Sequence, residues 1–164
     1  VFSEEGVARG MGASIGFNSG VSSLDVGHDG DMDVVVGAEG GLDLMWVNGG
    51  VGVFRESATA LGLVPDTGAT RAVSVGDLDG DGDIDFVTVV LGSDEIVWHR
   101  NNGNGTYNTF SFVTGLNNPG NLVVADVDGD GDDDIVGASS GSFFPPGLNS
   151  ELFLLQNNGG GNWA

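Results

Sequence analysis

Three short segments of the sequence place aspartates at alternate positions, so that several carboxylates can converge on one point. They read DVGHDGDMD at residues 25–33, DLDGDGDID at residues 77–85 and DVDGDGDDD at residues 126–134. Two carboxylates about 4 Å apart repel by roughly 4 kcal/mol at an effective dielectric constant near 20, so such a loop needs a cation to fold. Calcium takes six to eight oxygen ligands in a flexible cage, which suits these loops better than magnesium does.

The spacing separates these segments from the EF-hand calcium loop. An EF-hand closes its site with a glutamate at position 12 and is flanked by helices, whereas position 12 here is Val36, Thr88 or Gly137. Short runs rich in β-branched residues follow the segments, at residues 34–38, 86–90 and 135–138. We therefore predict loops that lead into strands, with ligands from the side chains at positions 1, 3, 5 and 9 and from the carbonyl at position 7.

The acidic loops recur with a spacing that indicates a repeat protein. Asp77 follows Asp25 by 52 residues, and Asp126 follows Asp77 by 49. A short apolar run, an Asn-Gly turn and an aromatic residue recur with them, which predicts a β-hairpin at residues 44–54, 96–107 and 154–163. Each unit then forms a four-stranded antiparallel sheet of the kind that makes a β-propeller blade.

We therefore expect an all-β fold of three four-stranded blades in a single repeat domain, residues 1–164. The approximate units are residues 1–53, 54–106 and 107–164, and strands can be shared across these boundaries.

The runs DLDGDGDIDFVTV and DVDGDGDDDIVGA, with the hairpins that follow them, resemble FG-GAP and VCBS-type repeats, known from integrin α-subunit propellers and many secreted bacterial proteins. The resemblance covers nearly the whole chain and implies propeller blades with Ca2+ in the loop between two strands of each blade. The ligands that it implies are Asp77, Asp79, Asp81, Asp83 (through its carbonyl) and Asp85 in the second loop, and Asp126, Asp128, Asp130, Asp132 (through its carbonyl) and Asp134 in the third.

The first loop departs from this pattern, because its position 3 is Gly27 and its position 4 is His28. The carboxylates that remain there are those of Asp25, Asp29, Asp31 and Asp33. We expect their site to bind calcium more weakly or to use a water molecule as a ligand. The sequence thus predicts two strong calcium sites and one degenerate site.

Three blades are fewer than the four to eight that usually close a propeller. The segment VFSEE at residues 1–5 repeats VFRES at residues 53–57. The chain therefore begins with the kind of strand that its last hairpin lacks, and its two ends are complementary in register. We expect another copy of the chain to satisfy this match, in a closed oligomer or in an open head-to-tail filament. Alternatively, the three blades belong to a longer propeller or tandem array.

Composition excludes several classes of partner. The chain has 24 acidic and 4 basic residues and a formal net charge of −20, which excludes a nucleic acid, since phosphate binding needs clustered Lys and Arg. It has no cysteine, so something other than disulfides must cross-link it. Its apolar runs are too short for insertion in a membrane. The start at Val1, without a leader segment, indicates a processed product or a piece of a longer protein.

Signals of catalysis are weak. The pattern G-x-S-x-G, typical of a hydrolase nucleophile elbow, occurs at residues 12–16 and 137–141, but a glycine-rich chain produces it by chance and no strand-to-helix context surrounds it. His28 and His99 are predicted to be surface residues without a third metal ligand. We expect no enzymatic activity.

Three further features concern binding surfaces. Trp46 and Trp98 occupy equivalent positions, and we expect them in the core between blades rather than as stacking platforms for carbohydrate. Asn104 begins an N-glycosylation sequon in a predicted turn. Residues 143–146 are an insertion relative to the other units and a candidate contact loop.

Together these patterns predict an extracellular, calcium-stabilised module for structure or adhesion, since loops of this kind fill where calcium is millimolar. The expected partners are other copies of the chain or neighbouring repeats, and also glycans or a cell-surface protein. A lectin-like carbohydrate-binding module is the alternative.

Overall fold

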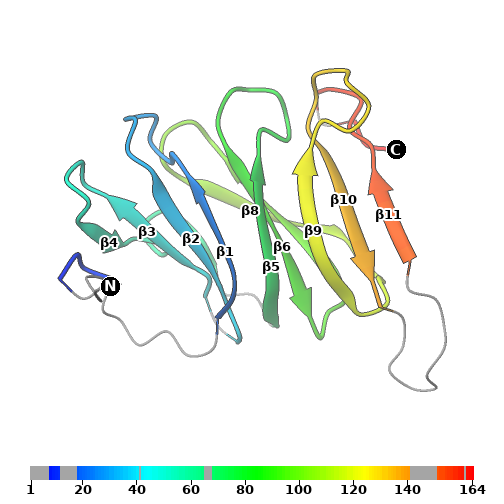
Figure 1. Cartoon of the computed structure of the whole chain (residues 1–164), viewed down its shortest axis with the longest axis horizontal. Helices are drawn as coiled ribbons and strands as arrows, with labels where there is room; N and C mark the ends of the chain where they lie inside the picture. The colour runs from blue at the N-terminus through cyan, green and yellow to red at the C-terminus, as the bar shows by residue number, and fades with distance from the viewer. Residues whose placement is uncertain (1–7, 12–17, 41, 65–67, 141–150, 161) are drawn as a thin grey trace, which may run out of the picture.

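The computed structural model describes residues 8–11, 18–40, 42–64, 68–140, 151–160 and 162–164 (Figure 1). The terminal segment 1–5, the motif at residues 12–16 and the insertion at residues 143–146 lie outside these ranges, as does the end of the motif at residues 137–141.

Three antiparallel sheets, each called a blade below, contain all the strands of the described residues. The first blade consists of β1 (Asn18–Leu24), β2 (Asp33–Ala38), β3 (Leu44–Asn48) and β4 (Phe54–Glu56). The second consists of β5 (Ala69–Gly76), β6 (Asp85–Leu91), β7 (Glu95–Asn101) and β8 (Tyr107–Val113). The third contains β9 (Pro119–Ala125), β10 (Asp134–Ser139) and β11 (Glu151–Leu155).

The fourth strand of the third blade is reduced to a short bridge. Asn157 pairs with Trp163, and the main chains of Gln156 and Ala164 exchange hydrogen bonds of 3.1 and 2.8 Å. The all-β prediction of propeller-type blades in an open arrangement is confirmed. The expected unit boundaries after residues 53 and 106 fall between the third and fourth strands of the first two blades, and they stay a prediction.

The blades lie side by side, with the innermost strands β1, β5 and β9 adjacent, and the N- and C-terminal parts of the chain lie at opposite ends of the array (Figure 1). Every residue of β6 from Asp85 to Val90 is buried. Phe86 packs with Val35 and Met45 of the first blade, whereas the adjacent Val87 packs with Ile135 of the third. The middle blade therefore joins two cores, one on each face.

Within the described residues, no helix has the length and apolar character that crossing a membrane requires.

His99 lies in this interior, so the expectation of a surface histidine is wrong at this position. The residue is 3% exposed, and its ring stacks on Phe86 with the centroids 4.2 Å apart. Its two ring nitrogens lie 3.2 Å from Thr88 Oγ1 and 3.1 Å from Thr109 Oγ1. Burial disfavours the charged imidazolium and lowers the pKa of His99 to about 3.

This burial predicts a loss of stability in mild acid. The unfolded chain protonates His99 at the ordinary pKa of about 6.5, whereas the folded chain does not until about pH 3. The stability that depends on neutral His99 is complete above pH 6.5. As the pH falls from 6.5 toward 3, the free energy of unfolding decreases by up to about 1.4 kcal/mol per pH unit. Urea denaturation at pH 7 and pH 5 should show a smaller loss for His99→Gln than for the parent. Equal losses in the two proteins would contradict the assignment.

Candidate metal-binding loops

The three acidic loops connect the first and second strands of their blades, β1 to β2, β5 to β6 and β9 to β10. They lie at the same end of the three sheets (Figure 1). In the second loop, carboxylate oxygens of Asp77, Asp79 and Asp81 all lie within 4.8 Å of one another. The third loop brings together Asp126, Asp128 and Asp130 in the same way. Among the described residues, the first loop gives no comparable group of three.

The carboxylate at position 1 shapes each loop from within. Asp77 accepts hydrogen bonds from the N–H groups of Gly80 (2.9 Å), Asp81 (3.1 Å) and Gly82 (2.9 Å). Gly82, at position 6, has a φ of 89°, a left-handed conformation that strains residues with a Cβ atom. Asp126 and Asp25 each accept two of the three equivalent bonds in their own loops. The turn thus presents its carboxylates on one side.

The aspartate at position 9 is buried and fastens its loop to the neighbouring hairpin. Asp85 is fully buried and accepts N–H bonds from Leu78 (3.3 Å) and Asn101 (2.7 Å), together with one from Trp98 Nε1 (3.0 Å). Two main-chain N–H groups likewise reach the equivalent aspartate of each other loop: Val26 and Asn48 bind Asp33, and Val127 and Asn157 bind Asp134. The predicted role of position 9 as a metal ligand stays a prediction.

The partner asparagines, Asn48, Asn101 and Asn157, are functional residues that the sequence reasoning missed. Each one uses its own side-chain oxygen to accept an N–H bond from the glycine two residues later, over 3.2, 3.1 and 3.1 Å respectively. The repeated signal was present in the runs NGG, NNG and NNG. A hairpin turn and an acidic loop are therefore held together by one asparagine in every blade.

Contacts also connect the three loops to one another. The N–H of Asp77 donates to Asp133 Oδ2 (3.1 Å), and Asn157 Nδ2 donates to the carbonyl of Leu78 (3.0 Å). His28 Nδ1 lies 3.3 Å from Asp83 Oδ1, so this position-7 side chain points to the first loop. Ligation through the carbonyls of Asp83 and Asp132 stays a prediction.

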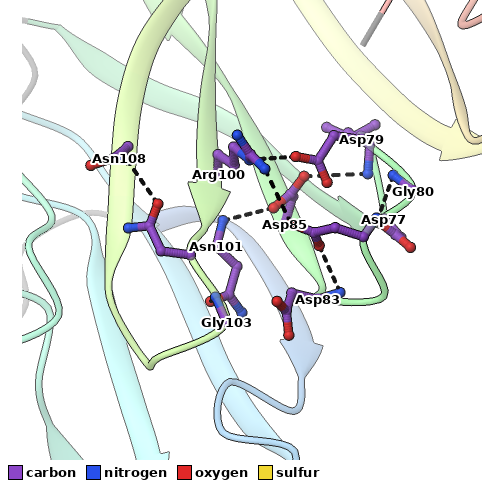
Figure 2. A network of polar contacts seen from close by, with 12 residues as sticks. Asp77, Asp79, Gly80, Asp83, Asp85, Arg100, Asn101, Gly103 and Asn108 are labelled. Carbon is purple, nitrogen blue, oxygen red and sulfur yellow. Dashed lines mark hydrogen bonds and ion pairs between the residues drawn. The ribbon is translucent and has the colours of Figure 1, made fainter. Parts of the chain in front are cut away.

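Burial and charge divide the carboxylates of the second loop. Burial raises the pKa of Asp85 to about 7, against the hydrogen bonds that favour its ionised form. Burial and the neighbouring Asp81 raise the pKa of Asp79. Burial alone would raise the pKa of Asp81, but the Asp83 N–H and the Arg100 guanidinium outweigh it and lower that pKa. Figure 2 shows Arg100 pointing from its strand toward Asp79.

A cation would meet an unsatisfied atom in the second loop. The side chain of Asp79 is only 10% exposed, and its Oδ1 is buried with no hydrogen-bond partner among the residues that the structure describes. Leaving a charged oxygen in that state is costly, and a divalent ion bound between Asp77, Asp79 and Asp81 would satisfy it. The residues of this loop therefore fit a metal ion.

The other predicted features lie apart from the loops or beside them. Trp46 is 4% exposed, and Trp98 packs against Phe110, Phe112 and Trp163, so the expected core position of both tryptophans is confirmed. Their expected equivalence is wrong, because Trp46 pairs with Val34 and Met45 is the residue in register with Trp98. Asn104 lies exposed in a turn, where its side-chain oxygen accepts the N–H of Thr106 at 3.0 Å. Its glycosylation stays a prediction.

Blades of this topology, with acidic loops at one end, define a β-propeller-type repeat module. Residues 25–88 match the family model described as the FG-GAP-like repeat, which confirms the predicted resemblance in this part of the chain. No curated protein sequence matches the chain significantly.

Among solved structures, the chain is similar to a lectin from Agrocybe aegerita, whose structure was described for specific recognition of non-reducing terminal N-acetylglucosamine. The identity is 24% and the TM-score 0.54, over 88% of this chain and 36% of the lectin chain. The chain thus spans about a third of the lectin's length, and the likeness concerns the fold.

The position-9 contacts predict that Asp134→Asn is strongly destabilising. The amide would turn an N–H group toward one of the two main-chain donors, and an unsatisfied buried N–H costs about 1–3 kcal/mol. We expect the free energy of unfolding to fall by roughly 2–4 kcal/mol in urea denaturation with a chelator present, so that metal loss does not contribute. Glu151→Gln removes the same charge at an exposed site and is the control. Equal stability of the two variants would refute the contact's importance.

Proposed function

We propose that the chain is a calcium-stabilised repeat module of β-propeller type that acts outside the cell in structure or adhesion, without enzymatic activity. The observation that carries the proposal is the convergence of three carboxylates in each of two loops, one of them with the buried, unsatisfied Asp79 Oδ1. Hard oxygen donors in a flexible loop favour calcium. Extracellular loops of this kind bind at about 10⁻⁴ to 10⁻³ M, which suits millimolar calcium.

Calcium would act on stability. When bound, it would offset the repulsion between carboxylates at positions 1, 3 and 5 of the second and third loops. Because these loops contact each other through Asp77, Asp133 and Asn157, ions would also brace the junction between blades. In a chain without cysteine, this cross-linking takes the place of disulfides.

Removing calcium should therefore lower the melting temperature. At 1 mM calcium and a dissociation constant of about 10⁻⁴ M, each site adds roughly 1.4 kcal/mol, so two sites should raise the melting temperature by about 5–10 °C. Differential scanning calorimetry with calcium and with a chelator measures the shift. Asp126→Asn with Asp130→Asn should abolish at least half of it, and Glu151→Gln none. Identical melting in calcium and chelator would sink the proposal.

Self-assembly is the finer part of the proposal, and an exposed blade face supports it. Met45, Trp98 and Leu154 occupy equivalent positions in the three blades. Each pairs across the sheet with the valine two residues after the position-9 aspartate, which is Val35, Val87 or Val136. Met45 is fully buried against the second blade and Trp98 packs toward the third, but Leu154 is 49% exposed and the nearby Leu152 83%. In the first and second blades this surface packs against the next blade along the chain. In the third blade the same surface is exposed.

The first blade offers the complementary surface. Val21 is 68% exposed, although its equivalents pack inward on the preceding blade: Val73 lies in the core with the first blade and Leu122 in the core with the second. We infer that a further blade of this type docks on each face: that of another copy, which gives an open filament or a closed six-blade ring, or that of a neighbouring repeat in a longer array.

A charge at the exposed face should block this assembly. Leu154→Asp would place a carboxylate in the apolar contact and leave a folded monomer, whereas the parent should form larger particles. Light scattering after gel filtration and electron microscopy report the difference. Val51→Asp, at a turn residue that is 77% exposed, is the matched control. A parent that stays monomeric at high concentration would rule out self-assembly.

A lectin-like module is the second candidate, and the similarity to the Agrocybe aegerita lectin is what favours it. The tryptophans do not help this candidate, because Trp46 is buried and Trp98 Nε1 is bonded to Asp85. Saturable binding on a glycan array, retained in Leu154→Asp, would favour a lectin over a structural module.

A further inference from the structure

The second and third loops hold nearly the same aspartates but differ in the residue that covers them. Arg100 and Gln156 occupy equivalent positions, each directly before the asparagine that binds the position-9 carboxylate. Arg100 pairs through Nε with Asp79 Oδ2 and through Nη2 with Asp81 Oδ2, the latter at 3.2 Å. Gln156 donates a neutral hydrogen bond from Nε2 to Asp128 Oδ2. In the first blade this position is Val47.

We propose that Arg100 is a built-in cation of the second loop, which competes with the metal ion for Asp79 and Asp81 and supports the loop when the metal is scarce. The inference rests on the proposed calcium function and deepens it. It makes the third loop, covered by the neutral Gln156, the tighter site and the one more dependent on calcium.

The competition follows from the atoms involved. Asp79 and Asp81 stand at positions 3 and 5, whose carboxylates belong to the group that converges within 4.8 Å, and the guanidinium occupies one oxygen of each. A divalent ion in the same group would be repelled by a guanidinium at this distance. Tight binding in the second loop therefore requires Arg100 to withdraw, and its side chain is 43% exposed, so solvent is within reach.

Arg100 leaves the loop partly satisfied. It pairs with Asp79 Oδ2, yet Asp79 Oδ1 remains buried without a hydrogen-bond partner among the described residues. A singly charged, planar guanidinium cannot satisfy converging oxygens on all sides, whereas a metal ion can. The loop is therefore stable enough to keep its shape and still gains from the ion.

A reciprocal exchange in the full chain tests the inference. Arg100→Gln places the neutral glutamine of the third loop over the second loop, and Gln156→Arg places the arginine of the second loop over the third. Calcium titration by calorimetry gives the site affinities, and melting in chelator gives the metal-free stability. Arg55→Gln, which removes the same charge from an exposed position, is the control. Arg100→Gln should tighten the weaker site roughly 5- to 20-fold relative to Arg55→Gln and lower the melting temperature in chelator. Gln156→Arg should weaken the tighter site and raise that melting temperature.

The outcomes separate this inference from the proposed function. If the parent binds calcium but Arg100→Gln matches Arg55→Gln in both affinity and chelator melting, the competition is wrong and the calcium function stands. If the parent binds no calcium, the proposed function fails and the competition with it.

Discussion

The buried carboxylate at position 9 is the interaction on which each blade depends. Asp33, Asp85 and Asp134 each take two main-chain N–H groups, one from their own loop and one from the hairpin across the sheet. A buried carboxylate is tolerated only when hydrogen bonds compensate it, so loop and hairpin must come together for either to be stable. The three blades therefore share one local geometry although their loops differ in sequence.

The hydrogen bond from the asparagine N–H to the position-9 carboxylate also determines which side chain lies over the acidic loop. In the second and third blades the residue before this asparagine lies beside position 3, and Arg100 also reaches position 5. A valine, an arginine and a glutamine occupy this position in the three blades. A single substitution there changes the charge of the loop without changing its backbone, which is how one repeat can hold three loops of different electrostatic character.

The sequence predicted the parts of the fold that local patterns control. Short β-branched and apolar runs with Asn-Gly turns predicted the strands and hairpins, and alternate aspartates around a glycine predicted the loops and the convergence of positions 1, 3 and 5. It could not give contacts that depend on distant segments. The bond from Asn101 to Asp85 spans 16 residues, and His99 is buried because Phe86 and two threonines enclose it. The shortened outer edge of the third blade was likewise invisible in a hairpin motif that all three units share.

The two ends of the array are not equivalent. In the first blade, the N–H of Phe54 donates to the carbonyl of Arg9 at 2.7 Å, and in the second, the N–H of Tyr107 donates to the carbonyl of Leu61 at 2.7 Å. The outermost strand of each of these two blades is therefore bonded to a turn that precedes it in the chain. The third blade exposes Leu152 and Leu154, whereas Met45, the equivalent of Leu154 in the first blade, and Ile96, the equivalent of Leu152 in the second, are fully buried. An exposed apolar face of this kind is typical of a surface that packs against another element.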